Sequence, residues 1–136
     1  MLLVKTFLSS SAIDGFGVFA GQTIEEGTPI WAFNPLIDML IDDHGFQSLP
    51  DIAQAFVTKY AYRHDQLRAY VLCSDDARFM NHSNMPNVRS IYPDGDIHGI
   101  DLAARRIAEG EEITCDYATF DPEHFKRLTG AARISG

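Results

Sequence analysis

The stretch Arg78-Phe79-Met80-Asn81-His82-Ser83-Asn84-Met85-Pro86-Asn87 decides how the rest of this chain is organised. An apolar pair near its start is followed at once by side chains that carry amides and an imidazole. The asparagines and the proline at its end favour a turn. The order predicts an apolar anchor, a polar elbow and a return strand, with amides and main-chain donors placed to meet a polar ligand. Alone, Asn-His-Ser is a weak signal, because three polar residues in a loop are usually only solvated.

Two further stretches, one on each side, strengthen this signal. Gly15-Phe16-Gly17-Val18-Phe19-Ala20 lies upstream, and Gly110-Glu111-Glu112-Ile113-Thr114-Cys115-Asp116-Tyr117 lies downstream. Two glycines around an aromatic residue let a ligand approach the main chain. They are not the dinucleotide fingerprint, since the third glycine and a following helix are missing. The alternation in the downstream stretch predicts that Cys115 and Tyr117 share one face of a strand.

Length and composition indicate one globular domain spanning residues 1–136, with 46% hydrophobic and 22% charged residues. The net charge of −8 argues against a nucleic-acid partner, which needs a basic face. Such a charge suits a basic partner through long-range attraction, although solubility alone is the better supported explanation.

The cysteines, Cys73 and Cys115, are too few and too far apart for a disulfide scaffold or a structural zinc site, so we predict no metal. Reduced thiols fit a cytoplasmic location, with export lacking a cleavable signal left open. The apolar run over residues 1–4 is too short for a signal-peptide core or a membrane span, and no membrane partner is expected.

The hydrophobic pattern predicts a mainly β fold with a helical insert over the variable region 34–68. In that insert, we expect a helix capped by Ser48 that presents Ile52, Phe56 and Tyr60 as one apolar face. A C-terminal helix is predicted over residues 121–130. Short strands are expected over residues 2–7, 18–20, 29–33, 70–73, 87–92 and 97–103, with a hairpin turn at 93–96.

Together, the three stretches resemble the SET domain of protein lysine methyltransferases. The family's Gly-x-Gly matches residues 15–17, its Arg-Phe-x-Asn-His-Ser-x-x-Pro-Asn matches residues 78–87, and its Gly-Glu-Glu-Leu-Thr-x-Asp-Tyr matches residues 110–117, with isoleucine at position 113. The resemblance covers about residues 5–120, and the insert matches only in place and length. It implies a β-clip fold with knot-like C-terminal threading, an exception to the rule against threaded chains.

The resemblance also implies S-adenosylmethionine as cofactor, S-adenosylhomocysteine as its product, and a lysine in a protein substrate as methyl acceptor. It assigns the cofactor site to Phe16, Gly17, Asn81, His82 and Tyr117. Tyr117 is implied to be the catalytic residue, where cofactor and lysine meet. The lysine would enter from the opposite face through a channel, for which the candidate wall residues are Phe33, Tyr60, Tyr62, Cys115 and Phe120.

Methyl transfer from a sulfonium to an amine needs an in-line arrangement and an uncharged amine. A free lysine has a pKa near ~10.4, so near neutral pH about one molecule in a thousand is uncharged, a cost of roughly 4 kcal/mol. An aromatic-walled channel favours the uncharged amine by desolvation. Tyr117 would orient the amine or the methyl group. Whether it also takes the proton is open, because an unperturbed phenol has a pKa near ~10.

Two departures from the family pattern matter. Cys115 stands where the family usually carries phenylalanine or tyrosine, which suggests a roomier pocket that permits multiple methylation. Alternatively, Cys115 is a small hydrophobic residue whose volume another aromatic side chain replaces. The cysteine-rich zinc segment that follows the tyrosine in many histone-directed members is missing here. The helix at 121–130 could close over the site instead, although core packing explains its aromatics equally well.

Two other functions stay open from the sequence. One is a SET-fold module that binds peptide or cofactor without turnover, and the other is a small β-clip domain that binds saccharide or ice. The sequence does not give the substrate protein, the degree of methylation or the oligomeric state. A homodimer is an option, since a SET domain without flanking segments can borrow surface from a second copy.

Overall fold

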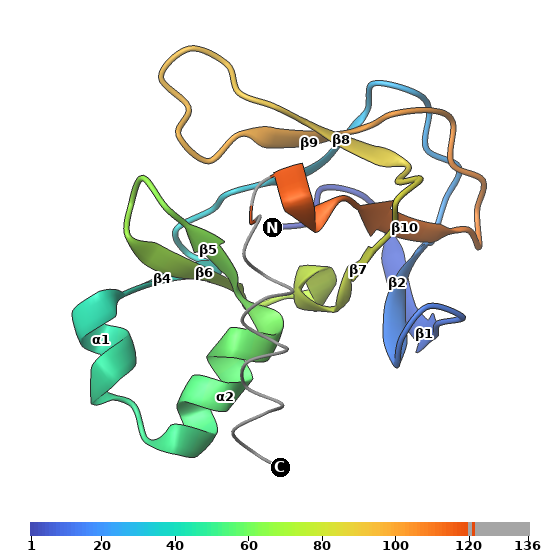
Figure 1. Ribbon diagram of the computed structural model, residues 1–136. Coiled ribbons are helices and arrows are strands. Elements are labelled where there is room, and N and C mark those ends of the chain that lie inside the picture. The colour runs from blue at the N-terminus through green and yellow to red at the C-terminus, as the bar shows by residue number, and fades with distance from the viewer. Residues whose placement is uncertain (120, 122–136) are drawn as a thin grey trace.

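The computed structural model describes residues 1–119 and 121, and it confirms a mainly β fold (Figure 1). Three small sheets surround the middle of the molecule. The first has the order β1-β2-β10-β7, the second β3-β9-β8 and the third β4-β6-β5. The strands are β1 (Thr6–Ser10), β2 (Phe16–Ala20), β3 (Pro29–Ala32), β4 (Asp38–Asp42), β5 (Tyr62–His64), β6 (Ala69–Cys73), β7 (Asn81–His82), β8 (Val88–Ile91), β9 (Ile100–Ala103) and β10 (Glu112–Cys115).

The main core lies between the first and second sheets, and it explains why β2 and β10 pair. Val18 and Ile113 are register partners across these two strands, and both are fully buried. Ile24 and Ile107, which form an isolated bridge, bury their side chains in the same cluster. Buried β-branched side chains of this kind fit a pleated surface well. The core therefore holds the Gly-x-Gly strand against the strand that ends at Cys115.

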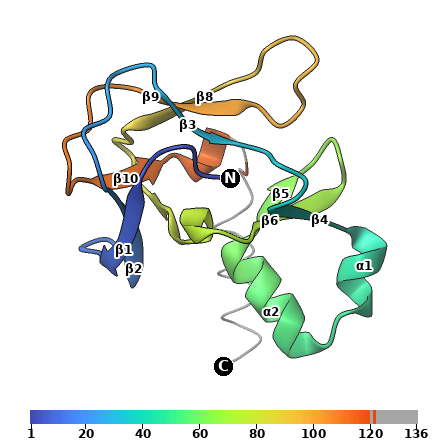
Figure 2. The same cartoon turned by 180° about the vertical axis from the view of Figure 1, so that it is seen from behind.

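The insert is more mixed than the sequence suggests. It contains β4, the helix α1 (Asp43–Ser48), the helix α2 (Asp51–Tyr60) and β5, which lie together on one side of the molecule in both views (Figures 1 and 2). The prediction that Ser48 caps the helix is wrong. The N-cap of α2 is Pro50, which makes no side-chain cap bond, whereas the Ser48 hydroxyl donates to the Gly45 carbonyl at 2.7 Å.

The predicted apolar face of α2 is also wrong in its direction. Ile52 is 83% exposed and Phe56 is 45% exposed, whereas Val57 is buried. Val57 packs with Ala61 and Tyr70 in a small second core. The helix is therefore present where expected, but contact with β6 selects a neighbouring face. Hydrophobic periodicity predicts that a helix forms, but it does not predict which element the helix packs against.

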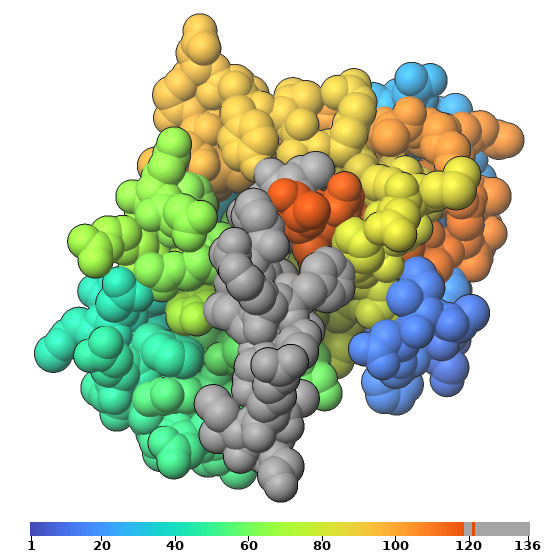
Figure 3. All heavy atoms as spheres, in the orientation of Figure 1, coloured from blue at the N-terminus to red at the C-terminus, as the bar shows by residue number. Residues whose placement is uncertain are grey.

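Two 3-10 turns connect the sheets to the middle of the molecule. The first, η1 (Asp76–Phe79), precedes β7, and the second, η2 (Tyr117–Thr119), follows β10. The loop that joins β8 and β9 projects beyond the sheet that these strands form (Figure 1). The space-filling view shows this region at the top of the molecule in yellow and orange (Figure 3). None of the helices in the described residues is both long and apolar enough to cross a membrane. The knot-like threading and the helix at 121–130 stay predictions, and residues 122–130 lie outside the described part.

Candidate active site

One side-chain amide connects the three stretches that the sequence singles out. Asn81 Nδ2 lies 3.1 Å from the carbonyl oxygens of Asp14 and Phe16, and 3.2 Å from Glu112 Oε1. The two-residue strand β7 runs parallel to β10, which pairs Asn81 with Thr114. The polar elbow, the Gly-x-Gly strand and the final strand therefore converge at one place.

His82 supports the backbone beside this junction. Its Nδ1 accepts a hydrogen bond from the main-chain N–H of Tyr117 at 3.1 Å, so this nitrogen carries no proton. The proton then lies on Nε2, which donates to Asn84 Oδ1 at 2.9 Å. Both ring nitrogens thus have partners in the protein, and Nδ1 also lies 3.5 Å from Asp116 Oδ1, so the ring is fixed beside the Tyr117 segment.

β10 ends at Cys115, and Tyr117 is the first residue of η2. The prediction that Tyr117 shares a strand face with Cys115 is therefore wrong. Its hydroxyl donates to the main-chain carbonyl of Met80, directly before the elbow. Burial raises the pKa of the Tyr117 phenol, and the neighbouring Cys115 raises it further. The phenol therefore stays protonated at neutral pH, where it serves as a hydrogen-bond donor rather than a proton acceptor.

Gly17 is required at its position by a neighbouring carboxylate. A Cβ added to Gly17 would lie 1.8 Å from Glu112 Oε1, the oxygen that Asn81 also contacts. The preceding residue, Phe16, keeps 59% of its surface exposed. An exposed aromatic ring, a carboxylate and main-chain groups thus lie together at the start of β2, where the Asn81 side chain of β7 reaches the Phe16 carbonyl.

We expect Gly17→Ala to lower the free energy of unfolding by about 1–2 kcal/mol, because the added methyl forces Glu112 away from Asn81. Urea unfolding measures this change. In a double-mutant cycle, Gly17→Ala added to Glu112→Ala should cost much less than Gly17→Ala alone, since the clash is gone. Equal costs in both backgrounds would show that the carboxylate is not the cause.

Asn87, the last residue of the central stretch, completes the hydrogen bonding of β10. It is only 2% exposed. Its Nδ2 donates to the Glu112 carbonyl at 2.8 Å, and its Oδ1 accepts from the Thr114 N–H at 2.9 Å. The sequence places Asn87 at a turn and at the start of the strand predicted over residues 87–92, but its hydrogen bonds to β10 appear only in the structure.

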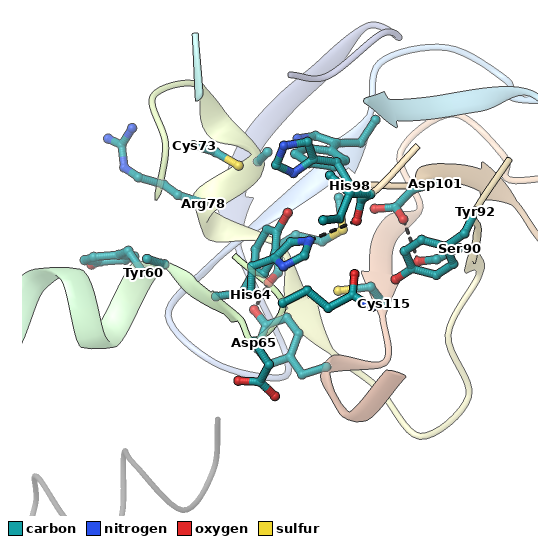
Figure 4. Close-up of a pocket in the computed structure, with 18 of the residues that line it drawn as sticks. Tyr60, His64, Asp65, Cys73, Arg78, Ser90, Tyr92, His98, Asp101 and Cys115 are labelled. Atoms are coloured by element: carbon teal, nitrogen blue, oxygen red, sulfur yellow. Dashed lines mark hydrogen bonds between the residues drawn. The ribbon is translucent and has the colours of Figure 1, made fainter. Parts of the chain in front are cut away.

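A cavity of about 520 Å³ opens between the second and third sheets and reaches Tyr117 (Figure 4). Three predicted channel residues, Tyr60, Tyr62 and Cys115, line it together with Tyr117. Phe33 is not in its lining but stacks on the lining residue His98, with ring centroids 3.8 Å apart and planes 6° apart. Phe120 lies outside the described residues.

Several lining residues have no counterpart in the sequence predictions: Trp31, Ser90, Tyr92, His98 and Asp101. One signal was visible, because Asp101 interrupts the apolar segment from Ile100 to Ala103 with a charge. Two of these side chains have buried polar atoms without a hydrogen-bond partner among the described residues, namely Trp31 Nε1 and His98 Nδ1. Polar atoms left in this way favour a cavity whose ligand supplies hydrogen bonds.

The edge around Phe16 fits the cofactor that the sequence resemblance implies. The exposed Phe16 ring offers a stacking surface, and the Glu112 carboxylate offers a negative charge near the junction. Asn81 fits less simply, because its Nδ2 donors already have protein acceptors. The role of Asn81 in cofactor binding stays a prediction. The main-chain groups and Oδ1 of Asn81 would make the contacts.

Comparison with known proteins agrees with this geometry. The family profile described as SET domain matches residues 15–118. This chain belongs to the SET domain family. A region of the human histone-lysine N-methyltransferase 2B is 31% identical over an alignment of 116 residues that covers 79% of this chain but only 4% of that protein. A solved structure from Plasmodium falciparum, assigned as a histone methyltransferase, has a TM-score of 0.57 at 20% identity. It is matched over 85% of this chain and 95% of that one. This likeness shows the fold alone.

Proposed function

We propose that this SET domain transfers a methyl group from S-adenosylmethionine to the side-chain amine of a lysine in a protein substrate. The observation that carries the proposal is the convergence at Asn81, which brings the Gly-x-Gly strand and the Tyr117 segment to one junction. On one side lies the exposed edge at Phe16, and on the other lies the cavity that ends at Tyr117. Two binding regions beside one buried phenol suit a transfer between two molecules.

The residues that would hold the cofactor are Phe16, Gly17, Asn81 and His82, with Tyr117 at the reacting centre. When bound, S-adenosylmethionine supplies an electrophilic methyl group. The Tyr117 segment is held in place by the bond from its N–H to His82 and by the bond from its hydroxyl to Met80. Fixed orientation of this kind contributes a large part of the rate in transfer reactions.

A lysine-containing peptide suits the cavity by shape and charge. Aromatic side chains at Trp31, Tyr60, Tyr62 and Tyr92 contribute to its lining, and such rings attract a cation over their faces. Tyr60 already has Lys59 Nζ 5.1 Å from its ring centroid. A substrate lysine would therefore compete with Lys59 at the mouth of the cavity. The net charge of −8 favours a basic substrate.

The test is incubation of the purified protein with cofactor labelled on the methyl group and a cell lysate, followed by identification of the labelled residue. Label on lysine side chains supports the proposal. Binding of cofactor without any transfer would support the alternative, a SET-fold module that binds peptide or cofactor without turnover. Absence of both cofactor binding and transfer would contradict the proposed function and would leave only the peptide-binding form of the alternative.

Cys115 gives a prediction about the product. It is buried and lines the cavity together with Tyr117, so a larger side chain at this position would occupy cavity space. We expect the wild-type protein to add more than one methyl group, and Cys115→Tyr to shift the product towards monomethyl-lysine because the ring fills this space. Mass spectrometry of a methylated peptide measures the distribution. Only monomethyl product from the wild type would contradict the prediction.

A further inference from the structure

Asp101 occupies the middle of the sheet face that borders the cavity. It lies on the central strand β9, with Trp31 opposite it on β3 and Ser90 opposite it on β8. Directly opposed residues in antiparallel strands point to the same side of a sheet. All three side chains therefore share one face, and all three line the cavity (Figure 4).

Ser90 fixes the orientation of the Asp101 carboxylate. The Ser90 hydroxyl donates to Asp101 Oδ1 at 2.6 Å, a short bond that is typical of a charged acceptor. Among the described residues, Oδ2 has no hydrogen-bond partner. A carboxylate held by one oxygen and open at the other is a ready ligand for a hydrogen-bond donor inside the cavity.

Charge complementarity identifies the donor as a cation. Burial raises the pKa of Asp101, and the Ser90 bond and the Met1 amino group offset only part of that effect. A cation bound at the open oxygen would favour the charged carboxylate further. The aromatic rings of Trp31 and Tyr62 meet edge to face 6.3 Å apart beside it. A carboxylate with aromatic faces binds an alkylammonium ion better than a neutral amine.

Asp101, Cys115 and Tyr117 all line the same cavity. The Asp101 charge is close enough to raise the pKa of the Cys115 thiol, after burial, and the thiol in turn raises the pKa of the Tyr117 phenol. A cation on Asp101 would therefore lie in the space that leads to the reacting centre.

We propose that Asp101 is a substrate-binding and specificity-determining residue, whose carboxylate binds the ammonium group of the substrate side chain in the cavity. The inference rests on the proposed function for the identity of that side chain, but the ammonium site itself does not. A lysine is almost entirely protonated near neutral pH. Asp101 therefore recognises the abundant, protonated form as the side chain enters, before the amine loses its proton for transfer, and it also suits methylated lysines, which keep their positive charge.

The experiment uses the only tryptophan of the chain, Trp31, as a fluorescent reporter in the cavity. The full chain is titrated at pH 7 with n-butylammonium chloride and, separately, with the neutral probe 1-butanol. Asp101→Asn keeps the size of the side chain and can still accept from Ser90. The matched control is Asp94→Asn, the same change at an exposed position in the turn of the same hairpin. Thermal unfolding verifies that both variants are folded.

We expect Asp101→Asn to weaken n-butylammonium binding at least 10-fold, with 1-butanol binding unchanged and Asp94→Asn like the wild type. Equal loss of both probes in Asp101→Asn, unchanged ammonium binding, or no saturable response of the wild type would each overturn the proposal. These outcomes are independent of catalysis. If ammonium binding depends on Asp101 but no lysine is methylated, the proposed function fails and the ammonium site remains.

The pH dependence of the same titration gives a second readout. As pH falls through the raised pKa of Asp101, the carboxylate loses its charge and the wild type should lose affinity. Other titratable groups line the same space, namely Lys59, Tyr60, Tyr62, His64, Asp65, Cys73, Arg78, Tyr92, Asp96, His98, Cys115 and Tyr117, and the charge of the Met1 amino group acts on Asp101. The Asp101→Asn variant keeps all of these groups, so they contribute to the pH dependence of both proteins. A decline as steep in Asp101→Asn as in the wild type would therefore overturn the assignment.

Discussion

Replacing Tyr117 by phenylalanine is expected to lower the rate of methyl transfer about 100-fold, the effect typical of losing one contact that holds a reacting group in position. Tyr117 lines the cavity, and its hydroxyl is oriented by a part-buried hydrogen bond to the Met80 carbonyl. It is therefore a fixed polar group beside the place where the amine must be aligned. Phenylalanine keeps the ring and its packing but leaves that place without a hydroxyl. The rate constant for transfer to a peptide, measured at saturating cofactor, tests this expectation.

The matched control for this prediction is Tyr70→Phe. Tyr70 is buried in the second core with Val57 and Ala61, and it is not in the lining of the cavity. Loss of its hydroxyl should change stability without changing the rate for the folded protein. If Tyr117→Phe lowered the rate only as much as Tyr70→Phe does, the hydroxyl would have no role beyond folding. Cofactor binding to Tyr117→Phe, measured by calorimetry, should stay within about threefold of the wild type if the hydroxyl acts mainly on the amine.

Much of the site could be predicted because its signals are local in the sequence. The polar elbow after Met80 and the glycines at Gly15 and Gly17 reflect backbone requirements that only certain residues satisfy. The hairpin between β8 and β9 was visible in its turn residues, and its two strands lie within the predicted ranges. These features are set by short-range chemistry, so a single sequence reveals them.

What the sequence could not give depends on contacts between distant segments. The Asn81 amide contacts Phe16 and Asp14, which precede it by 65 and 67 positions along the chain. No local sequence pattern encodes those partners. The buried face of α2 depends on β6, which explains why Val57 rather than Ile52 packs inward. Asp101 has Trp31 and Ser90 as its neighbours on the two adjacent strands, and this arrangement exists only in the folded sheet. Cross-strand neighbours of this kind require the register, which sequence spacing alone does not fix.

The largest effect on stability is expected at Asn87, where alanine should lower the free energy of unfolding by about 3 kcal/mol. The side-chain amide occupies both hydrogen-bonding directions, since it donates to the Glu112 carbonyl and accepts from the Thr114 N–H. Alanine leaves both main-chain groups without their partner at a buried position, and each such group costs about 1–3 kcal/mol. Urea unfolding measures the loss. Asn84→Ala, the same change at an exposed residue of the same turn, should cost less than about 1 kcal/mol.

Asn87→Asp separates hydrogen bonding from volume at this position. Aspartate has nearly the same shape, but when ionised it can only accept, so one carboxylate oxygen would face the Glu112 carbonyl. Burial raises the pKa of such a carboxyl in the folded state above its unfolded value. Relative to the wild type, the variant should therefore be least stable above that pKa and should recover as pH falls and a proton returns to the oxygen. A deficit that does not change with pH would mean that Asn87 stabilises β10 by packing rather than by its paired hydrogen bonds.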